Sequence, residues 1–248
     1  MIYETRQHGM FVTLPNTDER VVFEVMSLLS WLQHSFVEAN TALILFNKEQ
    51  SKPIKTPNKE EWLNSKKRRL AIMDALKRDD APVNSEIELY EHADRIIRQE
   101  NLNNGILPFS LEHKIIFIYA GAFIHALDRF EKFFKVLIKV AHAPDGLSPI
   151  YLQFKEDFPT LRKIRNTTEH LEDRSRGLKL DRRHNLVPIE VSGVITLNSL
   201  NGNIFGTMLD DGSFGEIAVS AESMVKLQSL YQKILDSFKW EGSPQVIP

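Results

Sequence analysis

An arginine and a histidine five positions apart are the residues of this 248-residue chain best suited to chemistry on a phosphate. They are Arg165 and His170, and the polar Asn166 directly follows the arginine. A guanidinium offers a planar fork of donors that matches phosphate oxygens. An imidazole takes up or releases a proton near neutral pH. Together these groups could handle an RNA phosphate without a metal ion, because RNA supplies its own nucleophile in the ribose 2′-OH.

The residues that position this pair are predicted to form a helix over about 149–174. Asn166 and His170 are four residues apart and therefore share one helical face. Asp173 and Arg174 continue that face. The opposite face is apolar at helical spacing, through Leu161, Ile164, the Thr168 methyl group and Leu171.

A proline inside this segment, Pro159, predicts a kink or a break into two helices. Arg165 is rotated from His170 by about 140° on a helical wheel, so one helix holds the pair loosely. A two-fold dimer could bring two copies of each residue into one cleft. Glu169 is spaced to pair with Arg165, and Asp173 is spaced to tune His170.

The same residues also have a purely structural interpretation. Asn166, His170 and Arg174 could form a solvated helix face, with Glu169 and Asp173 as salt-bridge partners. The spacing alone does not distinguish this interpretation from a catalytic one.

The stretch Arg165-Asn166-Thr167-Thr168-Glu169-His170 resembles the R-[polar]-x-x-x-H signature of the HEPN superfamily. These proteins are helical bundles, and many are metal-independent ribonucleases of toxin–antitoxin, phage-defence and RNA-processing systems. The resemblance implies a homodimer whose two chains share one cleft, RNA as the substrate, and an antitoxin or regulatory protein as a further partner. Some HEPN toxins carry a tyrosine two residues after the histidine, where an antidote nucleotidyltransferase acts. This chain has Glu172 there, which argues against regulation of that kind.

The net charge of −2 means that contacts with RNA must come from local basic patches. One patch, at residues 66–69 and 77–78, is interpreted as a solvated face. The other follows His170 and is predicted to contact the RNA backbone, with a solvated face as the alternative. It consists of Arg176, Lys179, Arg182 and Arg183.

Several other chemistries lack their sequence signals. The chain has no cysteine, no H-x-x-x-H pair and no glycine-rich phosphate loop, so neither a metal site nor a cofactor is predicted. The amino-terminal residues contain no apolar signal core. The most apolar run, Ile115–Leu127, is too short to span a bilayer. We therefore expect a cytoplasmic protein with no membrane partner.

Periodicity predicts six helices, with three strands between the fifth and the sixth. The last helix is preceded by alternating β-branched segments separated by Asn-Gly and Asp-Gly turns, which are typical of an antiparallel meander. The tail from residue 242 to 248 is predicted to be frayed. The helices are expected at about 18–49, 58–78, 82–101, 110–142, 149–174 and 220–239, and the strands at 189–197, 203–209 and 214–219.

These observations predict a mainly α protein: a HEPN-like antiparallel helical bundle with a small three-stranded antiparallel β-meander before the last helix. Residues 1–248 would form a single domain with a helical insertion at 50–108 and the meander as an insertion at 188–219. The expected function is metal-independent endoribonuclease activity. The alternatives are a non-catalytic HEPN-like dimeric binding protein and an unrelated helical scaffold that matches the motif by chance.

Overall fold

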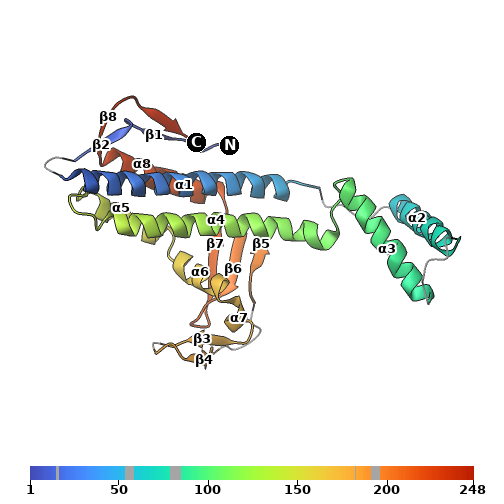
Figure 1. The fold of residues 1–248 in the computed structure, drawn as a ribbon. Helices are drawn as coiled ribbons and strands as arrows, with labels where there is room; N and C mark the ends of the chain where they lie inside the picture. The colour runs from blue at the N-terminus through green and yellow to red at the C-terminus, as the bar shows by residue number, and fades with distance from the viewer. Residues whose placement is uncertain (15–16, 54–58, 79–84, 182, 191–195) are drawn as a thin grey trace. The chain divides into compact units, whose positions relative to one another are not determined.

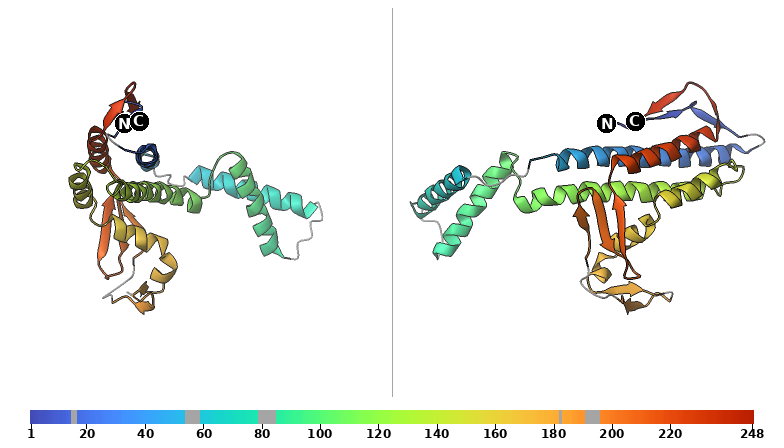
Figure 2. Two further views of the ribbon diagram at one scale, coloured as in Figure 1. Left: turned by 60° about the vertical axis from the view of Figure 1, so that its left-hand side comes forward. Right: turned by 180° about the vertical axis from the view of Figure 1, so that it is seen from behind.

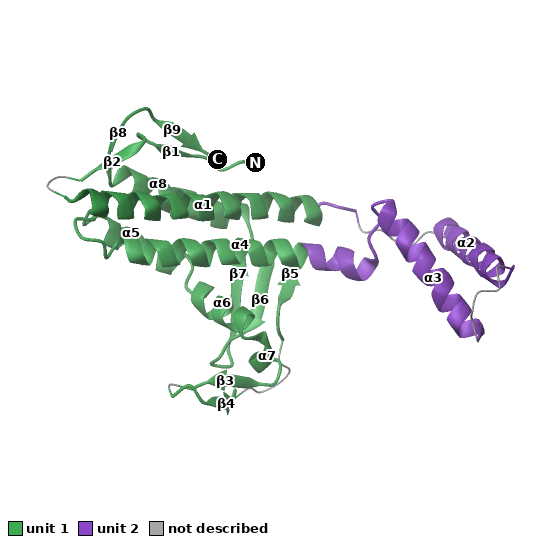
Figure 3. Ribbon diagram, in the orientation of Figure 1, with its two compact units in different colours: residues 1–50, 116–248 green, residues 51–115 purple. Residues whose placement is uncertain are grey.

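The computed structural model describes residues 1–14, 17–53, 59–78, 85–181, 183–190 and 196–248. The fold is mainly helical with small antiparallel sheets, so this part of the predicted fold class is confirmed (Figure 1). The chain forms two compact units, residues 1–50 with 116–248 and residues 51–115 (Figure 3). Among the described helices, none combines the length and the apolarity needed to cross a membrane.

The core of the larger unit is built from α1 (Glu19–Gln50), α4 (Phe109–Leu137), α5 (Leu147–Asp157) and α8 (Ala221–Asp236). Aromatic rings join these helices. Phe130 of α4 lies 5.9 Å from Phe154 of α5 and 5.7 Å from Tyr231 of α8, and Tyr231 lies 5.2 Å from Phe36 of α1 (ring centroids). Buried aromatic pairs of this kind add to the stability that area burial provides.

Polar caps mark where the first and the last helix of the chain, α1 and α8, begin. The Asp18 carboxylate accepts a hydrogen bond from the Arg20 backbone N–H at 3.1 Å, directly before α1. The Ser220 hydroxyl accepts from the Ser223 N–H at 3.2 Å at the start of α8. Both caps lie where the sequence predicts the helices to begin.

The segment that carries the motif is broken twice. α5 is followed by α6 (Leu161–Glu169) and α7 (Leu171–Arg174). The first break contains Pro159, as predicted. The second was not predicted: His170 leaves helical geometry, with φ −116° and ψ 42°, so the expected continuous helix to Arg174 is wrong.

A three-stranded antiparallel sheet precedes α8. Its strands are β5 (Ser199–Asn201), β6 (Ile204–Met208) and β7 (Phe214–Ala218), in that order across the sheet, with Phe205 opposite Ile217. Gly202, with φ 59°, makes the turn between β5 and β6. The strand predicted at 189–197 falls mostly on residues 191–195, which lie outside the described residues. The first observed strand of this sheet begins at Ser199.

A small hairpin that the sequence analysis did not predict follows α7. It pairs β3 (Leu178–Leu180) with β4 (Leu186–Pro188). The Asp181 carboxylate accepts hydrogen bonds from the Asn185 N–H at 2.9 Å and the Arg183 N–H at 2.7 Å, which closes the hairpin turn and holds the pKa of Asp181 below its usual range.

The two ends of the described chain are paired with each other (Figure 2). β1 (Thr5–Gln7) pairs with β9 (Gln245–Ile247), and β2 (Phe11–Thr13) pairs with β8 (Lys239–Glu241). The prediction of a frayed tail is therefore wrong. The backbone of β1 supplies the hydrogen-bond partners that an isolated tail lacks, and Ile247, which lies opposite Thr5, is only 2% exposed because its side chain belongs to the hydrophobic core.

The smaller unit is a helical hairpin of α2 (Lys59–Arg78) and α3 (Glu86–Asn103), together with the first residues of α4. Arg69 of α2 pairs with Asp94 of α3 at 2.7 Å, and Arg68 pairs with Glu100. Two cations of the first basic patch therefore serve the contact between these helices. The unit spans 51–115, whereas the sequence analysis placed an insertion at 50–108.

Candidate functional site

The helix that carries Arg165 is fixed on the β-sheet side by its apolar face and by polar contacts. Leu161, Ile164 and Thr167 are buried, and α6 lies against β6 and β7 (Figure 1). The sequence analysis assigned Thr168 to the buried stripe in place of Thr167, because it extended the stripe to Leu171 across a helix end that it did not predict. The position of Arg165 is thus set by three buried residues of the same helix.

Two polar contacts add to this attachment. The Thr160 hydroxyl donates to the Glu216 carbonyl of β7 at 2.7 Å. Lys163 donates to the Asp211 carboxylate at 2.8 Å, and this bond, together with those from Ser213, holds the pKa of Asp211 well below its usual range. Both Lys163 and Asp211 have exposed side chains, so we expect their ion pair to add little to the free energy of unfolding.

Arg165 is held by three side chains. Its Nε lies 3.3 Å from the Asp128 carboxylate of α4, its Nη1 donates to Asn166 at 3.3 Å, and its Nη2 pairs with Glu169. The pairing with Glu169 is the one that the four-residue spacing predicts. Asp128 is 5% exposed and also pairs with Lys132 at 2.7 Å, so a buried carboxylate fixes the guanidinium from the side of α4.

Sequence reasoning did not select Asp128. The signal was present, because Asp128 is a carboxylate that directly follows the apolar residues Ala126 and Leu127 on the most hydrophobic helix. A charged residue is rarely buried unless it is paired, so this position indicates a cationic partner elsewhere in the fold.

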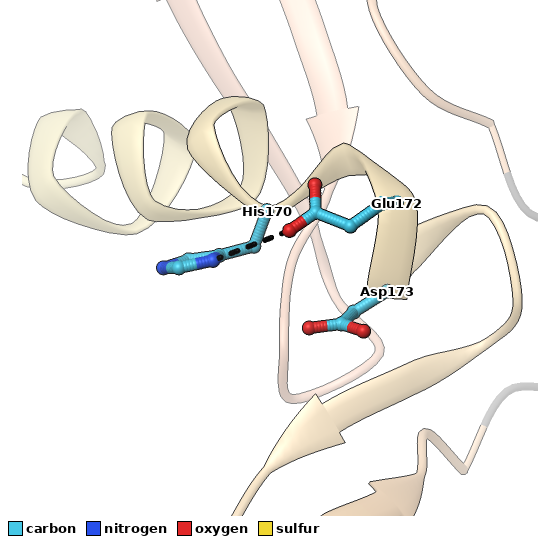
Figure 4. A group of neighbouring side chains, drawn as sticks. All are labelled: His170, Glu172 and Asp173. Carbon is cyan, nitrogen blue, oxygen red and sulfur yellow. Dashed lines mark ion pairs between the residues drawn. The ribbon is translucent and has the colours of Figure 1, made fainter.

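His170 lies at the end of α6 and is accessible, with 47% of its side chain exposed. Its backbone N–H still reaches the Asn166 carbonyl at 3.2 Å. Nδ1 of the ring lies 3.8 Å from the Glu172 carboxylate, and the other ring nitrogen points away from both Glu172 and Asp173 (Figure 4). Within the described residues, no hydrogen bond or ion pair joins His170 to Arg165, so a single chain presents the two groups separately.

The turn at His170 also gathers three groups that could ligate a metal ion. Ligand atoms of His170, Glu172 and Asp173 all lie within 4.8 Å of one another (Figure 4). The sequence analysis predicted no metal ligands, because these spacings match no common metal motif and depend on the break after α6. Exposed acidic groups are common without a bound ion, so we assign no function to the trio. The experiment with EDTA described below tests whether the reaction depends on a metal ion at these residues.

Arg174 does not lie on the solvated face that was predicted for it. It is 5% exposed, donates to the Leu178 carbonyl at 2.6 Å and lies 3.4 Å from the Asp210 carboxylate. The break at His170 turns α7 out of line with α6, so Arg174 faces β3 and the loop after β6. These contacts link α7 to β3 and to the loop after β6, so the solvated position expected for Arg174 is wrong, whereas its supporting role in the reaction stays a prediction.

We expect Arg174→Ala to lower the free energy of unfolding by about 1–3 kcal/mol, because it leaves the Leu178 carbonyl and Asp210 without their buried partner. For a chain of this size that is a fall in melting temperature of roughly 2–10 °C. Arg176→Ala is the matched control, since this neighbouring side chain is 63% exposed and forms a long, 3.7 Å ion pair with Asp173. Equal melting temperatures for the two variants would contradict the structural role of Arg174.

The predicted RNA-binding residues are distributed over the β3–β4 hairpin rather than along one helix. Arg176 is exposed before β3, Lys179 lies within β3, and Arg183 lies in the turn that follows. Arg182 lies outside the described residues. The structure thus presents a basic hairpin close in sequence to His170.

The arrangement offers two separate chemical capacities: a guanidinium fixed by a buried carboxylate and an accessible imidazole with one ring nitrogen facing away from its acidic neighbours. The first can bind an anionic oxygen and the second can transfer a proton.

Comparisons of the chain with protein-family models, with curated proteins and with solved structures found no match.

Proposed function

We propose that the protein is a metal-independent endoribonuclease of the HEPN type. The observation that carries this proposal is the fixed Arg165, held by the buried Asp128, with the accessible His170 at the end of the same helix. The proposal includes a HEPN-like bundle of α1, α4, the α5–α6 segment and α8, with the β5–β7 sheet before the last helix. It also includes a cytoplasmic location and an antitoxin or regulatory protein as a partner.

In the proposed reaction one His170 accepts the proton of the ribose 2′-OH as the 2′-oxygen forms a bond to the adjacent phosphorus. The bond between phosphorus and the 5′-oxygen breaks, and a second, protonated His170 gives its proton to that oxygen. Arg165 offsets the negative charge that develops on the phosphate, and Asn166 orients the phosphate or the imidazole. The products are a 2′,3′-cyclic phosphate and a 5′-hydroxyl.

The reaction needs a base and an acid at the same time, and one chain offers a single histidine at this place. We therefore propose a homodimer in which the α6 ends of two chains meet at the two-fold axis. A two-fold interface uses the same surface on both chains and so brings two copies of His170 to one cleft.

The decisive experiment is to incubate the protein with RNA in the presence of EDTA and to identify the ends of the products. We expect cleavage with a 2′,3′-cyclic phosphate, and no cleavage where the nucleotide at the cut carries a 2′-deoxy sugar. Cleavage of the 2′-deoxy substrate would rule out this mechanism. Activity that appears only when a divalent ion is restored would assign the reaction to the His170–Glu172–Asp173 trio instead.

A second candidate function, a non-catalytic HEPN-like dimeric binding protein, is favoured by the ion pairs of Arg165. Both Asp128 and Glu169 already neutralise this guanidinium, and a phosphate must compete with them. A dimer that binds RNA or another partner but cuts no RNA under any of these conditions would favour this candidate.

A further inference from the structure

A small cavity lies beside Arg165, between α4 and α6. Its volume is about 170 Å³, and it is lined by Asp128, Glu131, Lys132, Lys135, Arg162, Arg165 and Asn166. At roughly 30 Å³ per water molecule, this is space for about five waters. Sites for drug-sized ligands begin at about 300 Å³. The cavity therefore fits a group the size of a phosphate and not a nucleoside.

The lining has an excess of positive charge, with four cationic and two anionic side chains. Both carboxylates have partners of their own. Asp128 pairs with Arg165 and Lys132, and Glu131 accepts a hydrogen bond from the Tyr151 hydroxyl at 2.8 Å. Burial, with this hydrogen bond, raises the pKa of Tyr151 to about 12, so Tyr151 remains a donor to Glu131 at neutral pH.

Two cations of the lining remain without a counter-charge. In the part of the chain that the structure describes, neither Lys135 nor Arg162 has a hydrogen-bond or ion-pair partner from its side chain. Both are exposed enough for a ligand to reach them. Opposite charges attract, so an anion bound between Lys135, Arg162 and Arg165 would be stabilised by all three side chains. It would also relieve the repulsion between these cations.

The start of α6 adds to this positive field. Arg162 lies in the first turn, which contains no acidic residue, and the Thr160 side chain donates to Glu216 instead of capping the helix. Amino-terminal helix ends carry partial positive charge, which cations oppose and anions relieve. The unpaired Lys135 and Arg162 side chains therefore favour a bound anion in the cavity, and the uncapped start of α6, the helix that carries Arg162, adds to the positive field.

We propose that this cavity is a subsite for one backbone phosphate of RNA, next to the phosphate that Arg165 and His170 act on. Arg165 and Asn166 belong both to the cavity and to the proposed site, so a strand that enters the site places a neighbouring phosphate within reach of Lys135 and Arg162. The role in cleavage rests on the proposed ribonuclease function, whereas phosphate binding does not.

Binding is tested with a 2′-O-methyl oligoribonucleotide, which cannot be cut because it has no free 2′-OH. The affinity is measured by fluorescence anisotropy over a series of salt concentrations. For the Lys135→Gln/Arg162→Gln variant we expect the slope of log K against log salt to become shallower by about 0.7, the value for one lost phosphate contact on a single strand. Lys139→Gln/Lys239→Gln removes the same charge from exposed positions outside the cavity and should leave the slope unchanged.

Cleavage kinetics of unmodified RNA separate this inference from the proposed function. We expect the cavity variant to raise KM and leave kcat unchanged, as for a contact made equally in the ground and transition states. If the wild-type protein cuts no RNA but the salt slope still depends on Lys135 and Arg162, the ribonuclease proposal fails and the subsite stands. If RNA is cut and neither KM nor the slope differs from the control, the subsite is overturned.

Titration with inorganic phosphate distinguishes a backbone phosphate from a free one. Phosphate binding that requires Lys135 and Arg162, without any effect of the same substitutions on RNA binding, would assign the cavity to free phosphate and overturn its role toward RNA. Melting temperatures of the two double variants should agree within about 2 °C, since surface substitutions rarely change stability by more than about 0.5 kcal/mol.

Discussion

His170→Ala is expected to lower the rate of RNA cleavage by about 10²–10⁴-fold, the range that a general acid or base contributes. The side chain is 47% exposed, so the free energy of unfolding should change by no more than about 0.5 kcal/mol. Cleavage rates and melting curves of the purified protein measure both effects. A large fall in melting temperature would instead make His170 structural.

His34→Ala is the control for this substitution. His34 is an exposed histidine on α1, and its ring nitrogen contacts only the Ser30 carbonyl of its own helix among the hydrogen bonds of the structure. We expect cleavage at the wild-type rate. Equal loss of activity in both variants would mean that the assay detects a general effect of removing an imidazole and would contradict a specific role for His170.

The wild-type protein and its Arg165→Ala and His170→Ala variants also test whether two chains form the site. Light scattering at micromolar concentration should give the mass of a dimer, and a monomer that cuts RNA would contradict the composite site. Mixing Arg165→Ala chains with His170→Ala chains should not restore full activity, because each mixed dimer retains one arginine and one histidine.

Asp128→Asn is expected to reduce both cleavage and stability. It removes the negative charge that faces Arg165 and Lys132 in a place that is only 5% exposed. Losing a buried, paired charge of this kind lowers the free energy of unfolding by about 2 kcal/mol, or roughly 4–8 °C in melting temperature. A guanidinium displaced by as little as about 1 Å can reduce the rate about 10²-fold.

Glu38→Gln provides a matched comparison, because Glu38 pairs with Arg129 at 2.6 Å but both side chains are about half exposed. Exposed pairs of this kind contribute about 0–1 kcal/mol. A double-mutant cycle with Arg165→Met then tests whether Asp128 acts through Arg165. Additive effects on cleavage would show that it does not, and Asp128→Glu should recover part of the rate if it does.

The helices of the core could be predicted because their signals are local. The acidic cap Asp18 and the apolar period after it locate the start of α1, and Ser220 does the same for α8. Similarly, Pro159 lacks a backbone N–H and disrupts a helix whatever surrounds it. Each of these features depends on a few adjacent residues, which a sequence displays directly.

The features that the sequence analysis missed depend on tertiary contacts. Nothing between Glu169 and Leu171 breaks a helix by its own propensity, yet the chain turns there and Arg174 reaches Asp210 and Leu178. Asp128 meets Arg165 only because α4 and α6 lie side by side. The spacing that correctly predicted the Arg165–Glu169 pair acts within one helix turn, and no comparable rule links residues on separate elements.

The paired chain ends affect the order in which the protein can fold during synthesis. A ribosome makes the amino-terminal residues first, and domains generally begin to fold while the chain is still growing. The partners of β1 and β2, however, are β9 and β8, which are made only after α1, α4 and α8. A nascent chain can assemble α1 against α4 early, but Tyr3 and Val12 stay without their native neighbours until Lys239–Ile247 has left the ribosome. Closing these two ribbons is therefore a later step of folding than the assembly of α1 against α4.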